Sequence, residues 1–196
     1  MVSRRVALAL FVVSFPPATA RAEWQIKPFV GLTFGGGTTF VDPEHAVGKP
    51  NPVVGVTGVL LGEVLGLDAD FGRAPGFFQY GDQKLLLGSA TNTLTGNVVI
   101  ALPRRMTEYT LRPYFVAGAG LIHATIDGSF GAVKVSSTRP ALDVGGGATG
   151  FLSKRVGVSW ELRHFRSLGK GPLHGASIAG ERLSFWRADM AVVIRY

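Results

Sequence analysis

The chain has 196 residues and no cysteine, which suits one domain and excludes disulfides, thiolate metal sites and a thiol nucleophile. Its formal net charge is +7, but an expected leader holds Arg4, Arg5 and Arg21, so 17 basic residues (20 minus 3) remain against 13 acidic ones. Because these bases are scattered singly, we predict no nucleic-acid partner.

The first 22 residues have the pattern of a secretory leader. Arg4 and Arg5 precede the apolar run 6–15, two prolines follow it, and an A-x-A cleavage site ends at Ala22. The apolar run is about half of the roughly 20 residues that a membrane-spanning helix needs. We therefore expect residues 1–22 to be a cleaved signal peptide and residues 23–196 to be the mature domain.

After the leader, apolar residues recur at every second position, which predicts β-strands rather than helices. Eight segments show this period: 27–35, 52–63, 66–72, 94–102, 111–122, 141–152, 156–165 and 182–196. The connections alternate between long ones (36–51, 74–93, 127–140 and 167–181) and short ones (64–65, 103–110 and 153–155). Long loops at one end and tight turns at the other are typical of an up-and-down barrel that crosses a membrane.

Each segment has one apolar face and one face that carries polar or charged side chains. In the seventh segment, Val158, Trp160 and Leu162 face away from Glu161 and Arg163. In a membrane barrel the apolar face contacts lipid and the polar face lines the lumen. We therefore predict a lumenal ion-pair network of six acids and four bases. Its acids are Glu63, Asp68, Asp70, Asp143, Glu161 and Asp189. Its bases are Arg112, Arg163, Arg187 and Arg195.

The last segment ends on an aromatic residue that follows apolar residues at every second position. Met190, Val192, Ile194 and Tyr196 are expected to face lipid. This pattern resembles the C-terminal signal by which the outer-membrane assembly machinery recognises barrels. A closed barrel pairs its last strand with its first, because an open edge in hydrocarbon leaves backbone groups unsatisfied.

Several stretches carry a resemblance to a known family. They are "LDADFGRAPGFF" (67–78), "TGNVVIALP" (95–103), "RPYFVAGAGLI" (112–122), "WELRHFRSL" (160–168) and "FWRADMAVVIRY" (185–196). In these stretches the chain resembles the small eight-stranded outer-membrane β-barrel proteins, the OmpA/OmpX-like family. The resemblance implies an all-β, eight-stranded antiparallel up-and-down transmembrane β-barrel in the outer membrane of a Gram-negative-type bacterium. It implies no common activity.

The expected function is a structural role in the cell envelope, with exposed surface loops, no enzymatic activity and no cofactor. The expected partners are outer-membrane lipid, lipopolysaccharide and the barrel assembly machinery, and the barrel is expected to be a monomer. One alternative is a surface ligand-binding or adhesion protein that acts through loops 74–93 and 167–181, where Phe77, Phe78 and Tyr80 could form an aromatic contact patch.

Enzymatic alternatives depend on two patterns. Residues 145–150 read G-x-G-x-x-G, a dinucleotide fingerprint only where a strand gives way to a helix, and here the period of two continues. We expect Gly145 and Gly147, with Gly118 and Gly120, to leave room for arginine stems in the lumen. A lipid A deacylase-like triad of His164, Ser167 and Glu181 is the other candidate, but a spacing of three puts histidine and serine on opposite faces of a strand. The four histidines lack the spacing of a metal site.

Overall fold

The computed structural model describes residues 22–37, 50–77, 86–103, 106–107, 111–128, 134–168, 174–175 and 183–196. In these residues the strands are β1 (Glu23–Gly37), β2 (Asn51–Leu61), β3 (Leu65–Pro75), β4 (Leu86–Ala101), β5 (Arg112–Gly128), β6 (Lys134–Phe151), β7 (Val156–Ser167), β8 (His174–Gly175) and β9 (Ser184–Arg195). Within the described part of the chain, no helix is both long and apolar enough to cross a membrane. Of the expected leader only Ala22 is described, so its cleavage stays a prediction.

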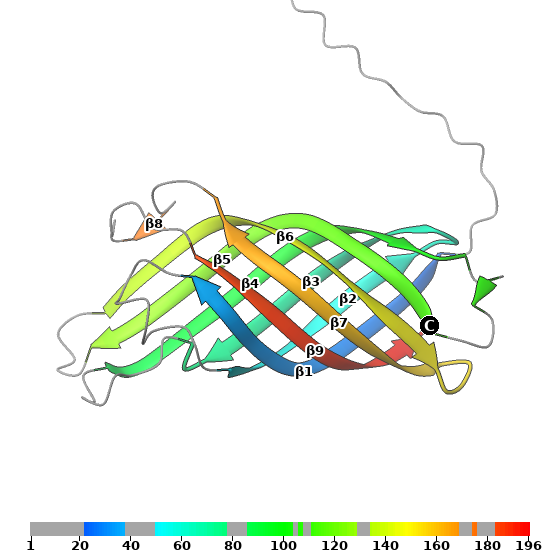
Figure 1. Ribbon diagram of the computed structural model, residues 1–196, viewed down its shortest axis with the longest axis horizontal. Coiled ribbons are helices and arrows are strands. Elements are labelled where there is room, and N and C mark those ends of the chain that lie inside the picture. Colours follow the sequence, from blue (N-terminus) through cyan, green and yellow to red (C-terminus); the bar gives the residue numbers. More distant parts are fainter. Residues whose placement is uncertain are drawn as a thin grey trace, which may run out of the picture.

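Eight long strands form one closed antiparallel barrel, as the sequence predicts (Figure 1). Each strand pairs with the next, and β9 closes the wall by pairing with β1, for example at Ile26 and Ile194. The short strand β8 pairs with β6 at Ser137 and Thr138, beyond the end of β7. The C-terminus and the start of β1 lie at the end of the barrel opposite β8. The short turns 62–64 and 152–155 lie at this same end.

The register of the barrel can be followed along one turn of paired residues. It leads from Trp24 on β1 through Leu60, Leu67, Val98, Ala117, Val144, His164 and Trp186, and returns to β1 at Phe34. After one circuit of the barrel the path returns to β1 ten residues from where it began (34 minus 24). This displacement means that the strands are strongly tilted relative to the barrel axis. A barrel of eight tilted strands is just wide enough for side chains to fill its interior.

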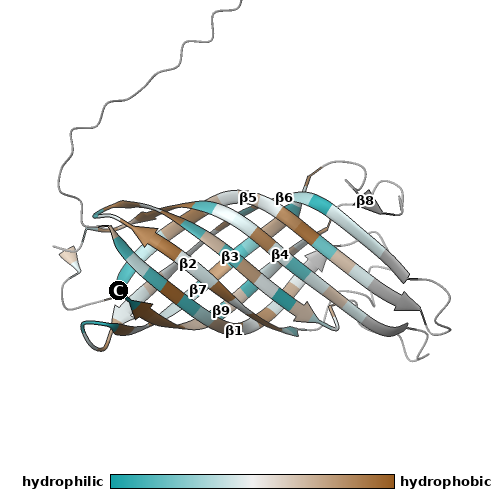
Figure 2. Ribbon diagram, turned by 180° about the vertical axis from the view of Figure 1, so that it is seen from behind, coloured by the Kyte–Doolittle hydropathy of each residue, from teal (hydrophilic) through white to brown (hydrophobic). Residues whose placement is uncertain are grey.

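Side chains alternate between the two faces of the wall along every long strand. On β3, for example, Leu67 and Phe71 are exposed while Asp68 and Asp70 are buried. Figure 2 shows the resulting alternation of apolar and polar residues along the strands. The exposed face is the apolar one, which is the inverted pattern of a membrane barrel.

Three strands extend several residues further towards the long loops than the sequence pattern predicts. β4 begins at Leu86, β5 continues to Gly128 and β6 begins at Lys134, so much of the predicted loops 74–93 and 127–140 is strand. The ladder continues because backbone pairing does not require an apolar face. The added residues include threonine, serine and asparagine on both faces of the strands, for example Thr91 and Asn92 on β4 and Ser136 and Ser137 on β6, which obscures the period of two. The three strands therefore extend past the apolar band.

Candidate functional site

The most distinctive feature of the molecule is a cluster of charged side chains at the centre of the barrel lumen. Arg163 on β7 and Arg187 on β9 are among the largest fully buried side chains, at 0% and 1% exposure. The five carboxylates around them come from four strands: Asp68 and Asp70 from β3, Asp143 from β6, Glu161 from β7 and Asp189 from β9. We call these seven residues the central network.

Arg163 connects four of the carboxylates. Its Nη2 lies 3.0 Å from Asp68 Oδ2 and 4.0 Å from Asp70 Oδ2, and its Nη1 lies 3.2 Å from Asp143 Oδ2. Its Nε donates to Glu161. A single guanidinium thus contacts β3, β6 and its own strand, so it braces opposite walls of the barrel.

Arg187 has a more directional environment. Its Nη1 and Nη2 donate to the two carboxylate oxygens of Asp70 at 2.8 and 2.9 Å, the bidentate geometry that gives the strongest arginine–carboxylate bonds. Its Nε forms a close ion pair with Asp189 Oδ2 at 2.9 Å, although the angle does not allow a hydrogen bond. The guanidinium also lies 4.4 Å from the ring centre of Phe29 and 5.0 Å from that of Phe165, within the range of cation–π attraction.

Neutral side chains supply further hydrogen bonds to the carboxylates. Thr57 donates to Asp70 at 2.8 Å, and the amide of Asn97 donates to Asp68 at 2.5 Å. Tyr114 donates its hydroxyl hydrogen to Glu161 at 2.8 Å. Carboxylates that are both paired and hydrogen-bonded are the form in which buried charge is tolerated.

Two glycines on β6 make room for this arrangement. A Cβ added at Gly145 would lie 2.7 Å from Arg163 Cγ, and one added at Gly147 would lie 2.8 Å from the Tyr114 hydroxyl. The G-x-G-x-x-G pattern therefore lies inside a strand, where it serves packing in the lumen. A dinucleotide would need a helix N-terminus at this point.

Apolar clusters lie on both sides of the central network. Towards the long loops, Phe29, Phe77, Phe165 and Phe185 pack with other buried residues, and the rings of Phe165 and Phe185 stack at 5.1 Å. Towards the short turns, Val59, Leu61, Val99, Ala101 and Val116 form a second cluster. The charged layer thus lies between two apolar layers, and electrostatic interactions are stronger in such surroundings than in water.

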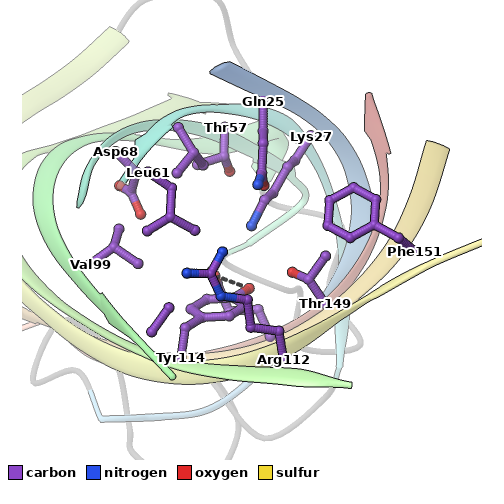
Figure 3. Close-up of a pocket in the computed structure, with 13 residues that line it drawn as sticks. Gln25, Lys27, Thr57, Leu61, Asp68, Val99, Arg112, Tyr114, Thr149 and Phe151 are labelled. Atoms are coloured by element: carbon purple, nitrogen blue, oxygen red, sulfur yellow. Dashed lines mark hydrogen bonds between the residues drawn. The ribbon is translucent and has the colours of Figure 1, made fainter. Parts of the chain in front are cut away.

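A small cavity lies between the central network and the short turns (Figure 3). Its volume is about 10 Å³, room for roughly one water molecule. Lys27 and Arg112 point into it, and Lys27 Nζ lies 4.6 Å from the centre of the Tyr114 ring. Lys27 makes no ion pair within 4.0 Å in the part of the chain that the structure describes.

The lumenal charges differ in part from the predicted set. Among the residues whose side chains are described, the inward-facing acids are Glu23, Asp68, Asp70, Asp143, Glu161 and Asp189. The inward-facing bases in the same residues are Lys27, Arg112, Arg139, Arg163, Arg187 and Arg195. The prediction omitted Glu23, Lys27 and Arg139. Lys27 could have been found, because it shares a strand face with Phe29 and Thr33 two and six residues later.

Three predicted members lie outside the central network. Glu63 is exposed on the turn after β2, because that strand ends at Leu61, so its placement in the lumen was wrong. Arg112 is buried at the turn end, where it donates to the carbonyls of Leu102, Gly62 and Glu63. Arg195 donates to the carbonyl of Lys154 and lies 3.5 Å from Glu23.

The structure separates the candidate hydrolase residues. His164 faces outward and packs on Trp186 with 4.8 Å between ring centres, whereas Ser167 is buried and its Oγ accepts the backbone N–H of Leu183. Since β7 runs through both residues, they lie on opposite faces and cannot share a hydrogen bond. Glu181 lies outside the described residues. Within the described ranges, no group of three histidine or carboxylate side chains is placed to hold a metal ion.

The residues of the predicted C-terminal signal have the expected exposure. Met190, Val192 and Ile194 face outward along β9, and the backbone N–H of Tyr196 donates to the carbonyl of Trp24 on β1. The proposed aromatic patch is different: Phe77 is buried in the lumen, and Phe78 and Tyr80 lie outside the described residues. Most of loops 74–93 and 167–181 is either strand or undescribed, so the adhesion alternative stays a prediction.

No family model and no curated protein matches the chain. The fold nevertheless matches solved structures of small bacterial outer-membrane barrels. Neisserial surface protein A aligns over 88% of this chain and 97% of its own, with 12% identity and a TM-score of 0.63. Ail, the attachment invasion locus protein of Yersinia pestis, aligns over 88% and 99%, with 12% identity and a TM-score of 0.54. The N-terminal barrel domain of OprF from Pseudomonas aeruginosa aligns over 89% and 97%, with 16% identity and a TM-score of 0.51. The likeness is one of fold.

Proposed function

We propose that this chain, which has the fold of the small eight-stranded outer-membrane barrel proteins, is an integral outer-membrane protein with a structural role in the envelope. In this proposal the barrel is a sealed, rigid element that spans the membrane and presents its long connections at the cell surface. It conducts no substrate and catalyses no reaction.

The observation that carries the proposal is the central network. Arg163 by itself contacts carboxylates on β3, β6 and β7, and buried apolar clusters lie above and below it. An ion that crossed the lumen would have to separate these pairs, and leaving a buried charge unpaired costs about 3–5 kcal/mol. These side chains support the proposal that the lumen does not conduct ions.

The outward face supports the membrane location. It carries exposed apolar side chains along every long strand, including Val30, Leu67, Leu94, Phe115 and Met190. A soluble protein rarely exposes an apolar surface that encircles the molecule. The solved outer-membrane barrels described above have the same fold, which also supports this location.

The test is conductance in planar bilayers, combined with fractionation of cells that express the chain. The wild-type barrel is expected in the outer-membrane fraction and should show at most rare, small openings. The double variant Arg163→Ala/Arg187→Ala should open more often if it folds, whereas Arg155→Ala, on an exposed turn, should behave like the wild type. Large and steady conductance of the wild-type protein would refute the sealed lumen.

A further inference from the structure

Two arginines lie on the lipid-facing side of the barrel wall. Among the outward-facing strand residues whose side chains the structure describes, Arg73 on β3 and Arg166 on β7 are the only lysine, arginine, aspartate or glutamate residues. Both are exposed, and neither makes an ion pair or side-chain hydrogen bond with another residue that the structure describes. This contrasts with the lumen, where six acids balance six bases among the described side chains.

Both arginines lie at the end of the barrel that carries the long loops. Arg73 is two residues from the end of β3, and Arg166 is one residue from the end of β7. At the other end, the described exposed charges are Glu63, Lys154 and Arg155. These three residues include both acidic and basic side chains, and they lie on turns between strands and not on the lipid-facing wall.

The surroundings of Arg73 place it at the boundary of the apolar band. Two residues nearer the middle of the barrel, Phe71 pairs with Leu94, and both are exposed apolar residues. In the register of Arg73 itself the partners are polar: Asn92 on β4 and then His123 on β5. The strands thus change from apolar to polar at this level, where the hydrocarbon of a bilayer gives way to headgroups.

Arg166 has a similar environment on the other side of the barrel. It pairs with Leu142 on β6 and with Ser184 on β9, and Trp186 lies two residues from Ser184 towards the middle of the membrane. Tryptophan is common at the headgroup level. Each arginine therefore has an apolar residue on its membrane side and a neutral hydrogen-bonding neighbour, Asn92 or Ser184.

An unpaired arginine at this level is best neutralised by an anion in the membrane itself. An arginine on the lipid face is strongly destabilising at the midplane of the bilayer and is tolerated near the interface. The guanidinium is planar and binds phosphate oxygens in pairs, which a lysine ammonium cannot do.

We propose that Arg73 and Arg166 form two binding sites for the phosphate groups of lipid A in the outer leaflet. Asn92 and Ser184 supply a neutral hydrogen bond beside each guanidinium. The inference rests on the outer-membrane location proposed above. It assigns the lipid A headgroup as ligand because both arginines lie at the end that this location places in the outer leaflet.

The test uses the purified, folded barrel in detergent micelles, titrated with bisphosphorylated lipid A and followed by native mass spectrometry. The double variant Arg73→Gln/Arg166→Gln should bind lipid A roughly 30-fold more weakly, since each basic residue near an anionic lipid surface contributes about a factor of five. Arg155→Gln, which removes an exposed arginine at the opposite end, should bind like the wild type. Arg73→Lys/Arg166→Lys should be intermediate, because it retains the charge and loses the paired geometry.

Three ligands identify what the site recognises: lipid A without phosphates, phosphatidylglycerol and inorganic phosphate. Dephosphorylated lipid A should bind weakly, and with equal affinity, to the wild type and the double variant. Phosphatidylglycerol and inorganic phosphate should not compete efficiently with bisphosphorylated lipid A for the wild-type barrel. Wild-type affinity in the double variant, or equal competition by phosphatidylglycerol or inorganic phosphate, would overturn the assignment. Because folding is verified by gel mobility and binding is measured in micelles, a failed fractionation experiment would refute the location without affecting this result.

Discussion

Replacing Arg163 by alanine should destabilise the barrel more than any other single change in its wall. The guanidinium is fully buried and contacts four carboxylates. Asp70 and Glu161 would still form ion pairs with Arg187, whose Nη1 lies 2.8 Å from Asp70 Oδ1 and whose Nη2 lies 3.7 Å from Glu161 Oε1. Asp68 and Asp143 would lose the ion pair that each makes with Arg163 and have no other among the described residues.

Removing one partner of a buried ion pair typically costs about 3–5 kcal/mol. For a domain of this size each kcal/mol lowers the melting temperature by roughly 2–4 °C, so a decrease of about 6–20 °C is expected. The assay is the loss of heat-modifiable mobility on unboiled gels, with circular dichroism at a fixed heating rate. Adding Asp68→Asn and Asp143→Asn to Arg163→Ala should restore part of the loss, because fewer charges are then left unpaired. A melting temperature for Arg163→Ala within 2 °C of the wild type, with Arg155→Ala as control, would refute the role of the network.

The other predictions concern export, assembly and activity. During export the expected signal peptide, residues 1–22, should be cleaved off. Mass spectrometry of the envelope-bound protein should then find Glu23 as its first residue, and an intact chain as the main species would contradict this. Met190→Lys puts a charge in the middle of the lipid face of β9 and should cost roughly 2–4 kcal/mol, so the folded fraction should fall, whereas Met190→Leu should fold normally. Deleting Tyr196 should lower the amount of barrel in outer-membrane fractions, and unchanged amounts would argue against its role as an assembly signal. Lipid A from cells that express the wild type or His164→Ala should have the same masses; a deacylated species formed only with the wild type would show that the chain is an enzyme.

The fold could be predicted from the sequence because the period of two is clear within the membrane. The alternation of Leu67, Ala69 and Phe71 with Asp68 and Asp70 defines both the strand and its two faces. The pattern becomes weak above the apolar band, where polar residues occur on both faces of β4, β5 and β6, such as Thr91 and Asn92 on β4. Strand ends there depend on backbone pairing with a neighbour, which leaves no mark in local composition.

The central network could be predicted as a set of residues but not as a set of contacts. Asp68 and Arg163 are 95 positions apart, and they meet only because of the ten-residue displacement around the barrel. Nothing local in the sequence specifies that displacement. The errors have local causes: Glu63 continues the alternation of β2 into the turn, and Lys27 stands at the edge of its segment.

The pairing of β1 with β9 also has a consequence for how the chain folds. A slip of two residues at this seam would keep every apolar side chain towards lipid, since the period of the strand is two. It would carry Arg187 roughly 7 Å along the strand, away from Asp70. A barrel closed in this shifted register would lose the ion pair between Arg187 and Asp70, although its lipid-facing surface would be unchanged. The lumenal charges therefore favour the correct register over the shifted one. A chain with Asp70→Asn and Arg187→Leu should close in more than one alignment, and disulfide trapping between cysteines introduced at Val30 and Met190, which face each other in the correct register, should then become incomplete.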